Sequence, residues 1–261
     1  MNIMLSDAPN TTPPTTPTTT FINGAGASIA QSVEVEKSLD RFTNEGTITG
    51  NVSFSGNHTT NTLNNTGTIT GGVNVGTGYT IGTVANSGVG NFGTAGFTNS
   101  GTINTFSNSS TVANTFTNSG TINTFENSST ANNTLTNNNS IGSITHTGIA
   151  GTGTGNNATL TYAGTGNVGS FTAGTAPTGT PPGNPTGAGD VTWNNTGNVT
   201  GSLTNNATTI NGDIGLQSAQ GGSVSVTNAG ATANINGTLT NKTNSTATLE
   251  NEGTIAGFTN E

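Results

Sequence analysis

Histidine, carboxylate and cysteine side chains carry most acid–base, nucleophilic and metal chemistry, and this sequence has few of them. Its 261 residues include two histidines, eleven carboxylates and no cysteine. Catalysis requires several such groups to meet in one place. His146 stands where the repeat described below normally has asparagine, so we interpret it as a substituted corner residue. His58 lies in the short polar segment Gly56–Thr59, and we interpret it as an exposed loop residue.

The carboxylates are scattered along the chain rather than clustered. The densest group is formed by Glu34, Glu36 and Asp40, beside Lys37 and Arg41. Polysaccharide lyases and hydrolases need clustered carboxylates, often with a basic partner. A short charged segment that caps or leads into a repeat explains this group at least as well. The sequence therefore predicts no catalytic residue, no metal site and no cofactor, and hence a protein that is not an enzyme.

Two short patterns suggest binding chemistry. Residues 88–93, GVGNFG, match G-x-G-x-x-G, which binds a dinucleotide when it lies between a strand and a helix. No helical periodicity follows it, and the 40 glycines of the chain make chance matches common. Thr-x-Thr at residues 47–49 and 68–70 could build a ladder of hydroxyl groups for an ordered surface such as ice. Threonine is also simply a good strand residue.

The composition excludes several classes of partner and fold. Charged residues make up 5% of the chain, and the net charge is −8 with three basic residues. No basic patch is available to neutralise a row of phosphates, so we expect no nucleic-acid partner. Hydrophobic residues make up 28% of the chain, a thin supply for an ordinary globular core. The low charge density is equally unlike that of a typical disordered chain.

An internal repeat determines the expected architecture. Residues 97–115 read FTNSGTINTFSNSSTVANT and residues 116–134 read FTNSGTINTFENSSTANNT, which is the same unit twice with a period of 19. Each unit contains a shorter motif, an apolar residue, then x-Asn-x, a small or polar residue, x and a second apolar residue. The motif begins at Phe42, Leu63, Phe97, Phe106, Phe116, Phe125, Leu135, Trp193 and Leu249.

This motif is typical of a short strand, a tight corner and a second short strand. Phe, Ile and Val suit a half-buried pleated surface, while Asn and Gly tolerate the left-handed backbone of a sharp bend. We predict an all-β fold, a parallel β-helix of about 19 residues per turn, in which each turn buries its apolar side against its neighbours. The predicted repeat core is Phe97, Ile103, Phe106, Phe116, Ile122, Phe125, Leu135 and Ile141. The predicted corner residues are Asn99, Asn108, Asn118, Asn127 and Asn137. The hexapeptide register of left-handed β-helices is absent, which favours a right-handed coil.

Proline marks where the coils are interrupted, because a residue without an N–H group is excluded from paired strands. All eight prolines lie in two clusters, at residues 9–17 and 177–185. We predict a Pro/Thr-rich linker or tail at residues 1–20, a β-solenoid at 21–173, a Pro/Gly-rich loop or hinge at 174–189 and more β-solenoid at 190–261. The last residues, FTNE, copy residues 42–45 and stop before the Gly-Thr-Ile that follows there. We therefore expect a fragment of a longer protein, truncated at its C-terminus.

The TNSGTI and TNEGTI repeats, with asparagine at the corners and almost no charge, resemble the passenger domains of autotransporters. Their low-complexity composition, rich in Asn, Thr and Gly, is similar to that of the pertactin-like and vacuolating-cytotoxin-like members from Gram-negative bacteria. The resemblance covers residues 42–147 well and residues 190–261 moderately. It implies a β-helix at the cell surface or secreted, exported by the type V route through an outer-membrane β-barrel that follows in the full-length chain. The G-D-S-G signature of protease passengers is absent.

The same resemblance implies a role in adhesion or autoaggregation, and in virulence. The expected partners are a host-cell or extracellular-matrix surface, like chains through self-association, and the downstream barrel. An alternative is a structural stalk of a toxin-like or binding autotransporter whose active part lies elsewhere in the full protein. The first hypothesis predicts that the chain binds cells or itself, and the second predicts that it is inert alone.

Overall fold

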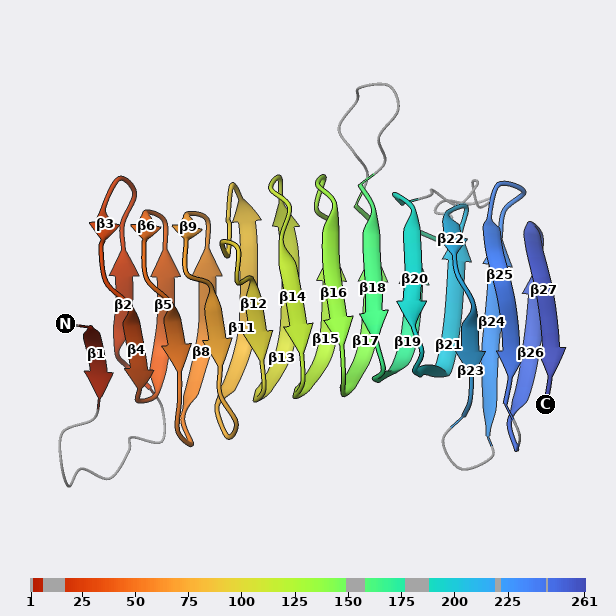
Figure 1. Ribbon diagram of the computed structural model, residues 1–261, viewed down its shortest axis with the longest axis horizontal. Helices are drawn as coiled ribbons and strands as arrows, with labels where there is room; N and C mark the ends of the chain where they lie inside the picture. The colour runs from red at the N-terminus through yellow and green to blue at the C-terminus, as the bar shows by residue number, and fades with distance from the viewer. Residues whose placement is uncertain (1, 7–16, 149–157, 177–187, 219–221, 243) are drawn as a thin grey trace. The chain divides into compact units, whose positions relative to one another are not determined.

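The computed structural model describes residues 2–6, 17–148, 158–176, 188–218, 222–242 and 244–261 (Figure 1). These residues form strands and no helix. Among them no helix is long and apolar enough to cross a membrane. The chain divides into two compact units, Met1–Asn123 and Thr124–Glu261, which are described separately below.

The strands are short, as expected for a repeat with closely spaced corners. Those that lie within the first unit are β1 (Ile3–Ser6), β2 (Thr20–Asn23), β3 (Ser28–Ile29), β4 (Val33–Glu36), β5 (Leu39–Asn44), β6 (Thr47–Ile48), β7 (Val52–Phe54), β8 (Thr59–Asn65), β9 (Thr68–Ile69), β10 (Val73–Val75), β11 (Thr80–Gly88), β12 (Phe97–Asn99), β13 (Thr102–Ser110) and β14 (Thr115–Asn118). β15 (Thr121–Asn127) crosses the boundary between the units. Those of the second unit are β16 (Asn133–Asn137), β17 (Ser140–His146), β18 (Leu160–Gly164), β19 (Asn167–Ala173), β20 (Val191–Asn195), β21 (Asn198–Asn206), β22 (Thr209–Asn211), β23 (Ile214–Leu216), β24 (Ser223–Ala229), β25 (Asn234–Asn241), β26 (Thr246–Asn251) and β27 (Thr254–Asn260).

In the first unit the strands form parallel stacks that wind around a common interior. One stack contains β2, β5, β8, β11 and β13, and a second contains β1, β4, β7, β10, β12 and β14. β3, β6 and β9 form a small third sheet. The stacks are in register, so that Phe21 lies opposite Phe42, and Phe42 opposite Leu63. The first unit is therefore a β-solenoid, and its coils lie side by side in Figure 1.

The second unit repeats this design of parallel stacks. One stack contains β17, β19, β21, β24 and β26. The other contains β16, β18, β20 and β22 and continues into β25 and β27. Leu160 lies opposite Val191, and Tyr162 lies opposite Trp193. The predicted all-β fold of stacked parallel strands is confirmed for both units.

Apolar side chains from opposite stacks meet in the interior of each unit. Phe97 on β12 and Phe106 on β13 contact edge to face, with ring centroids 4.8 Å apart. Phe171 on β19 and Trp193 on β20 make a similar contact at 5.0 Å in the second unit. Full burial of one such side chain contributes about 1.5–3 kcal/mol. All the predicted core residues are buried, namely Phe97, Ile103, Phe106, Phe116, Ile122, Phe125, Leu135 and Ile141.

The predicted period of 19 residues is wrong for most coils, which take about 21. Phe97 and Phe116 are paired 19 positions apart, like Asn99 and Asn118. The step from Asn44 to Asn65 is 21 residues. The longer coil has room for β6 as an additional short strand between β5 and β7. The near-identical copies at residues 97–134 made the shorter coil look general.

Glycine after the motif asparagine allows the coils to approach closely. A Cβ atom added to Gly67 would collide with the carbonyl oxygen of Gly46 in the preceding coil. A Cβ atom on Gly120 would collide in the same way with Gly101. The φ angles of these residues lie outside the left-handed region. Glycine at this position is therefore required by backbone contact between coils, and the prediction that it supplies a left-handed bend is wrong here.

The predicted domain boundaries need one correction. Ile3–Ser6, placed in the tail at residues 1–20, form β1 and pair with Val33–Glu36. Pro17 lies outside the strands, while the remaining prolines lie outside the described residues. At the end of the predicted loop, the N–H of Ala188 donates to Thr208 Oγ1 at 2.7 Å. That end of the loop is therefore bound to the second unit.

Candidate binding surface

Asparagine side chains form a continuous ladder inside the first unit. Asn23, Asn44, Asn65, Asn86 and Asn108 occupy equivalent positions in successive coils and are buried. Each Nδ2 donates to the Oδ1 of the next asparagine at 2.8 or 2.9 Å. The amide can repeat indefinitely in this way because it carries both a donor and an acceptor.

The second unit has comparable ladders. Nδ2 of Asn205 donates to Asn228 Oδ1, and Nδ2 of Asn228 donates to Asn251 Oδ1, at 2.8 Å in both cases. Gly164 lies opposite Asn137 in the next coil, and the Nδ2 of Asn137 donates instead to the phenolic oxygen of Tyr162 at 3.2 Å. Burial raises the pKa of Tyr162 to about 12, so this rung stays neutral.

The asparagines predicted at corners act through these ladders and not through their backbone conformation. Asn99, Asn118, Asn127 and Asn137 each end a strand, whereas Asn108 lies inside β13. All are buried. Among the described residues other than glycine, a positive φ occurs at Ala207 and Asn244. The predicted left-handed corner is therefore wrong for these asparagines. The signal that sequence reasoning missed is that asparagine follows each core residue by two positions and so points inward on the same strand.

His146 replaces an asparagine in a ladder. Nδ2 of Asn127 lies 3.1 Å from Nδ1 of His146, and Nε2 lies 3.2 Å from the carbonyl oxygen of Gly189. A neutral ring protonated on Nε2 satisfies both contacts. Burial lowers the pKa of His146 from its ordinary value of 6.5. The residue is thus a structural rung, and its ring is enclosed.

The other groups singled out in the sequence do not converge. His58 is half-buried, and its ring lies 6.3 Å from that of Tyr79. Asp40 accepts a hydrogen bond from Asn61 at 3.1 Å, and Glu34 accepts one from Asn2. Within the described ranges no three His, Cys, Asp or Glu residues lie close enough to hold a metal ion. Residues 88–93 begin at the last residue of β11 and lead into no helix.

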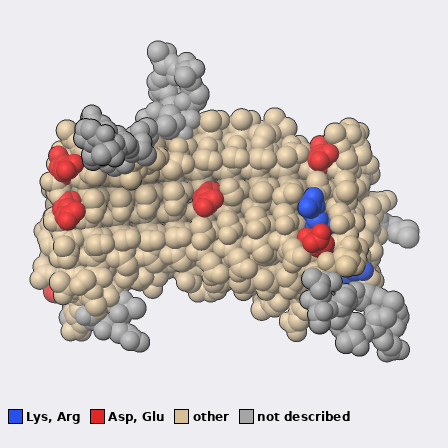
Figure 2. All heavy atoms as spheres, turned by 180° about the vertical axis from the view of Figure 1, so that it is seen from behind, with Lys and Arg blue, Asp and Glu red and all other residues tan. Residues whose placement is uncertain are grey.

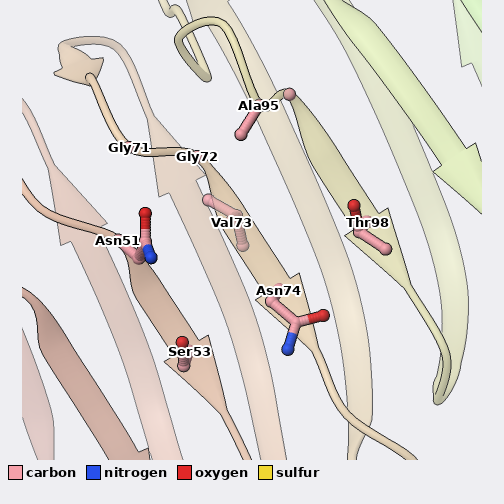
Figure 3. A pocket seen from close by; sticks show the side chains of 9 residues that line it. Asn51, Ser53, Gly71, Gly72, Val73, Asn74, Ala95 and Thr98 are labelled. Atoms are coloured by element: carbon pink, nitrogen blue, oxygen red, sulfur yellow. The ribbon is translucent and has the colours of Figure 1, made fainter.

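The first unit carries a shallow hollow on its outer surface (Figure 3). Its volume is about 270 Å³, and its side chains come from three neighbouring strands: Ser53 on β7, Asn74 on β10 and Thr98 on β12. Gly72, with φ of 97°, and Gly96 also line the hollow, and a Cβ atom at Gly72 would lie 2.7 Å from the carbonyl oxygen of Gly96. The hollow offers hydroxyl and amide groups but no charged group, so it is suited to hydrogen bonding and not to proton transfer.

The outer surface is polar but nearly uncharged. Figure 2 shows a face with broad areas free of Lys, Arg, Asp and Glu side chains. In the second unit, Lys242 and Glu261 form an ion pair of 3.5 Å with both side chains exposed. Threonine, serine and asparagine therefore supply most of the groups that a partner would meet.

The stacked coils define the chain as a β-solenoid repeat protein. Comparisons with protein-family models, with curated proteins and with solved structures found no match. What the chain does must therefore be argued from its own surfaces.

Proposed function

We infer that the chain is a surface-exposed structural and adhesive passenger segment of a type V secreted protein, at the surface of a Gram-negative bacterium or released from it. The observation that carries this proposal is the uncharged Asn, Thr and Ser surface wrapped around in-register parallel coils. The autotransporter-like repeats add the export route and the downstream barrel. Host cells, matrix or other copies of the chain are the proposed partners.

The physical basis of adhesion would be short-range contact. The chain has few charges to steer association. Binding would therefore depend on many hydrogen bonds and packing contacts spread over the coils, and each single contact is weak. Such binding should depend little on salt, because screening acts on charges. The weak salt dependence distinguishes the proposed adhesion from adhesion through a basic or acidic patch, which high salt would weaken.

A bead assay tests the proposal. Beads carrying the purified chain are mixed with epithelial cells, with matrix-coated surfaces and with one another, and adhesion is counted. Albumin-coated beads and beads carrying the chain without residues 42–147 are the controls. We expect adhesion or clumping with the full chain, a clear loss with the deletion, and little change between about 0.15 M and 1 M salt.

The stalk hypothesis makes the opposite prediction. The shallowness of the hollow over β7, β10 and β12 favours it, because that surface encloses little of a ligand. If beads carrying the full chain stay dispersed and bind neither cells nor matrix, the adhesive proposal is wrong and the stalk remains. Binding that disappears in 1 M salt would also contradict the uncharged-contact argument.

A further inference from the structure

One outer face of the second unit carries a regular array of hydroxyl groups. Four strands of one stack, β17, β19, β21 and β24, each contain serine, a buried apolar residue and threonine in succession. The four segments are Ser143-Ile144-Thr145, Ser170-Phe171-Thr172, Ser202-Leu203-Thr204 and Ser225-Val226-Thr227. Because alternate residues of a strand share a face, the serine and threonine of each segment both point outward.

The strand register aligns these segments into two columns. Ser143 lies opposite Ser170, Ser170 opposite Ser202 and Ser202 opposite Ser225. The threonines form the second column in the same order, from Thr145 through Thr172 and Thr204 to Thr227. Neighbouring strands are about 4.8 Å apart, and alternate residues on a strand are about 6.6 Å apart. The hydroxyls therefore lie on a nearly rectangular lattice.

The threonine column is available to a ligand. Thr145, Thr172, Thr204 and Thr227 are half-exposed, whereas in the serine column the hydroxyl of Ser143 donates to Thr124 Oγ1 at 3.4 Å. Threonine is stiff at χ1, so the hydroxyls hold their positions. The apolar residue between each pair is buried and fixes the strand.

The array itself carries no charge, and a carboxylate lies on the neighbouring strand at each end of it. Gly142, Gly169 and Gly201 precede the serines of β17, β19 and β21 and place no side chain beside them. The next strand, β26, continues the columns with Thr248 and then Glu250, and β15, which pairs with β17 on the other side of the array, carries the exposed Glu126. A flat ligand can thus contact all four rungs.

The preference of threonine for β-strands does not by itself explain why the serines and the threonines are sorted into separate columns. In the first unit the positions that follow the core residue in β5, β8, β11 and β13 carry Thr43, Asn64, Ala85 and Ser107, a mixture. The four strands β17, β19, β21 and β24 hold one residue type in each column although the lengths of their coils vary. The order is therefore a property of this face.

We propose that this face, the strands β17, β19, β21 and β24 with their Ser and Thr columns, binds the surface of ice. Water molecules in ice form a fixed lattice of hydrogen-bond donors and acceptors, and one of its repeats is close to the spacing of β-strands. Hydroxyls donate and accept, as ice requires. A crystalline polysaccharide is a weaker fit, because the array presents no aromatic ring on which a sugar could stack. This function does not depend on the proposed adhesion.

Ice partition tests the proposal directly. The purified full chain is equilibrated with slowly growing ice, and the fraction incorporated is measured together with the inhibition of ice recrystallisation. The disrupting variant is Thr172→Tyr with Thr204→Tyr, which places two bulky rings in the array. The matched control is Thr161→Tyr with Thr192→Tyr, at paired half-exposed positions on β18 and β20 in the other stack.

A second variant separates loss of hydroxyls from loss of shape. Thr172→Val with Thr204→Val keeps the branched side chain favoured in strands but removes two hydrogen-bonding groups. Two lost hydrogen bonds should raise the concentration needed for inhibition about tenfold or more. Far-UV circular dichroism and amide exchange confirm that each variant is folded.

The outcomes are decisive in either direction. Incorporation of the unaltered chain and of the control, with loss in both array variants, supports the proposal. Failure of the unaltered chain to enter ice overturns it, as does equal loss in the control or full activity of the valine variant. Retention on crystalline cellulose or chitin without ice incorporation would assign the array to a polysaccharide instead.

Discussion

The asparagine ladder should make a large contribution to the stability of the first unit, and Asn65 is the rung at which to measure it. Asn65 is fully buried. Its Oδ1 accepts from Asn44 at 2.8 Å, and its Nδ2 donates to Asn86 at 2.9 Å. Asn65→Ala removes both hydrogen bonds and leaves a buried donor and a buried acceptor without those partners. Each unsatisfied group costs about 1–3 kcal/mol. Asn44 Nδ2 keeps a long contact to the carbonyl of Thr68, 3.4 Å, which lessens the loss. We expect a net cost of about 2–4 kcal/mol.

The neighbouring residue provides a matched control. Asn64 lies on the same strand but points outward and is half-exposed, so Asn64→Ala should change stability by less than about 0.5 kcal/mol. Amide hydrogen exchange is the suitable assay, because each coil contacts only its neighbours and local stability can differ from global stability. Protection should fall most in β5, β8 and β11, the strands that carry the three asparagines.

The reasoning fails if Asn65→Ala and Asn64→Ala cost the same. Equal costs would mean that buried amide–amide hydrogen bonds add nothing beyond the packing of the apolar columns. Loss of protection confined to β8 would also contradict the ladder, because the unpaired groups belong to the adjacent coils.

Two other substitutions test the close contacts between coils. Gly67→Ala should lower the midpoint of urea unfolding because its Cβ would meet the carbonyl oxygen of Gly46, whereas Gly24→Ala, with open space around it, should not. Equal unfolding midpoints for the two variants would show that adjacent coils can move apart at Gly67 without loss of stability. His146 should make stability depend on pH: its pKa is lowered in the fold, so the unfolded chain takes up a proton first and stability is lost as pH falls below about 6.5. His146→Asn should flatten the unfolding midpoint between pH 7 and 5, and an unchanged pH profile would contradict the neutral, buried ring.

The sequence was sufficient to predict the stacked coils because their apolar positions recur with turn residues between them. Phe97, Phe106 and Phe116 were assigned to the core from spacing alone, and all three are buried. The role of the asparagines could not be derived in the same way. A polar residue next to glycine has the same signature whether it bends the backbone or points inward to a ladder. Only the pairing of Asn99 with Asn118 across two coils distinguishes these cases.

The hydroxyl array of β17, β19, β21 and β24 could not be found from the sequence for a related reason. The Thr-x-Thr segments at residues 47–49 and 68–70 are recognisable within single strands, but Thr68 pairs onward with Asn91 and the column stops. The longer array combines serine with threonine, and its strands are separated by connections of unequal length. No fixed period in the sequence brings Ser170 next to Ser202. The columns are therefore visible only once the register is known.

The in-register stack also explains why the chain contains so few charges. Each outward side chain lies about 4.8 Å from its counterpart in the next coil, and two like charges at that distance repel by about 1–3 kcal/mol. Amides and hydroxyls can instead donate to and accept from their own copies. Charges are stacked on neutral or oppositely charged residues: Arg41 lies opposite Thr62, Glu250 opposite Thr227, and Lys242 forms an ion pair with Glu261. In a parallel stack, each outward position is thus restricted to residue types that can lie next to a residue of the same type. This restriction accounts for the abundance of Asn, Thr, Ser and Gly without reference to any particular partner.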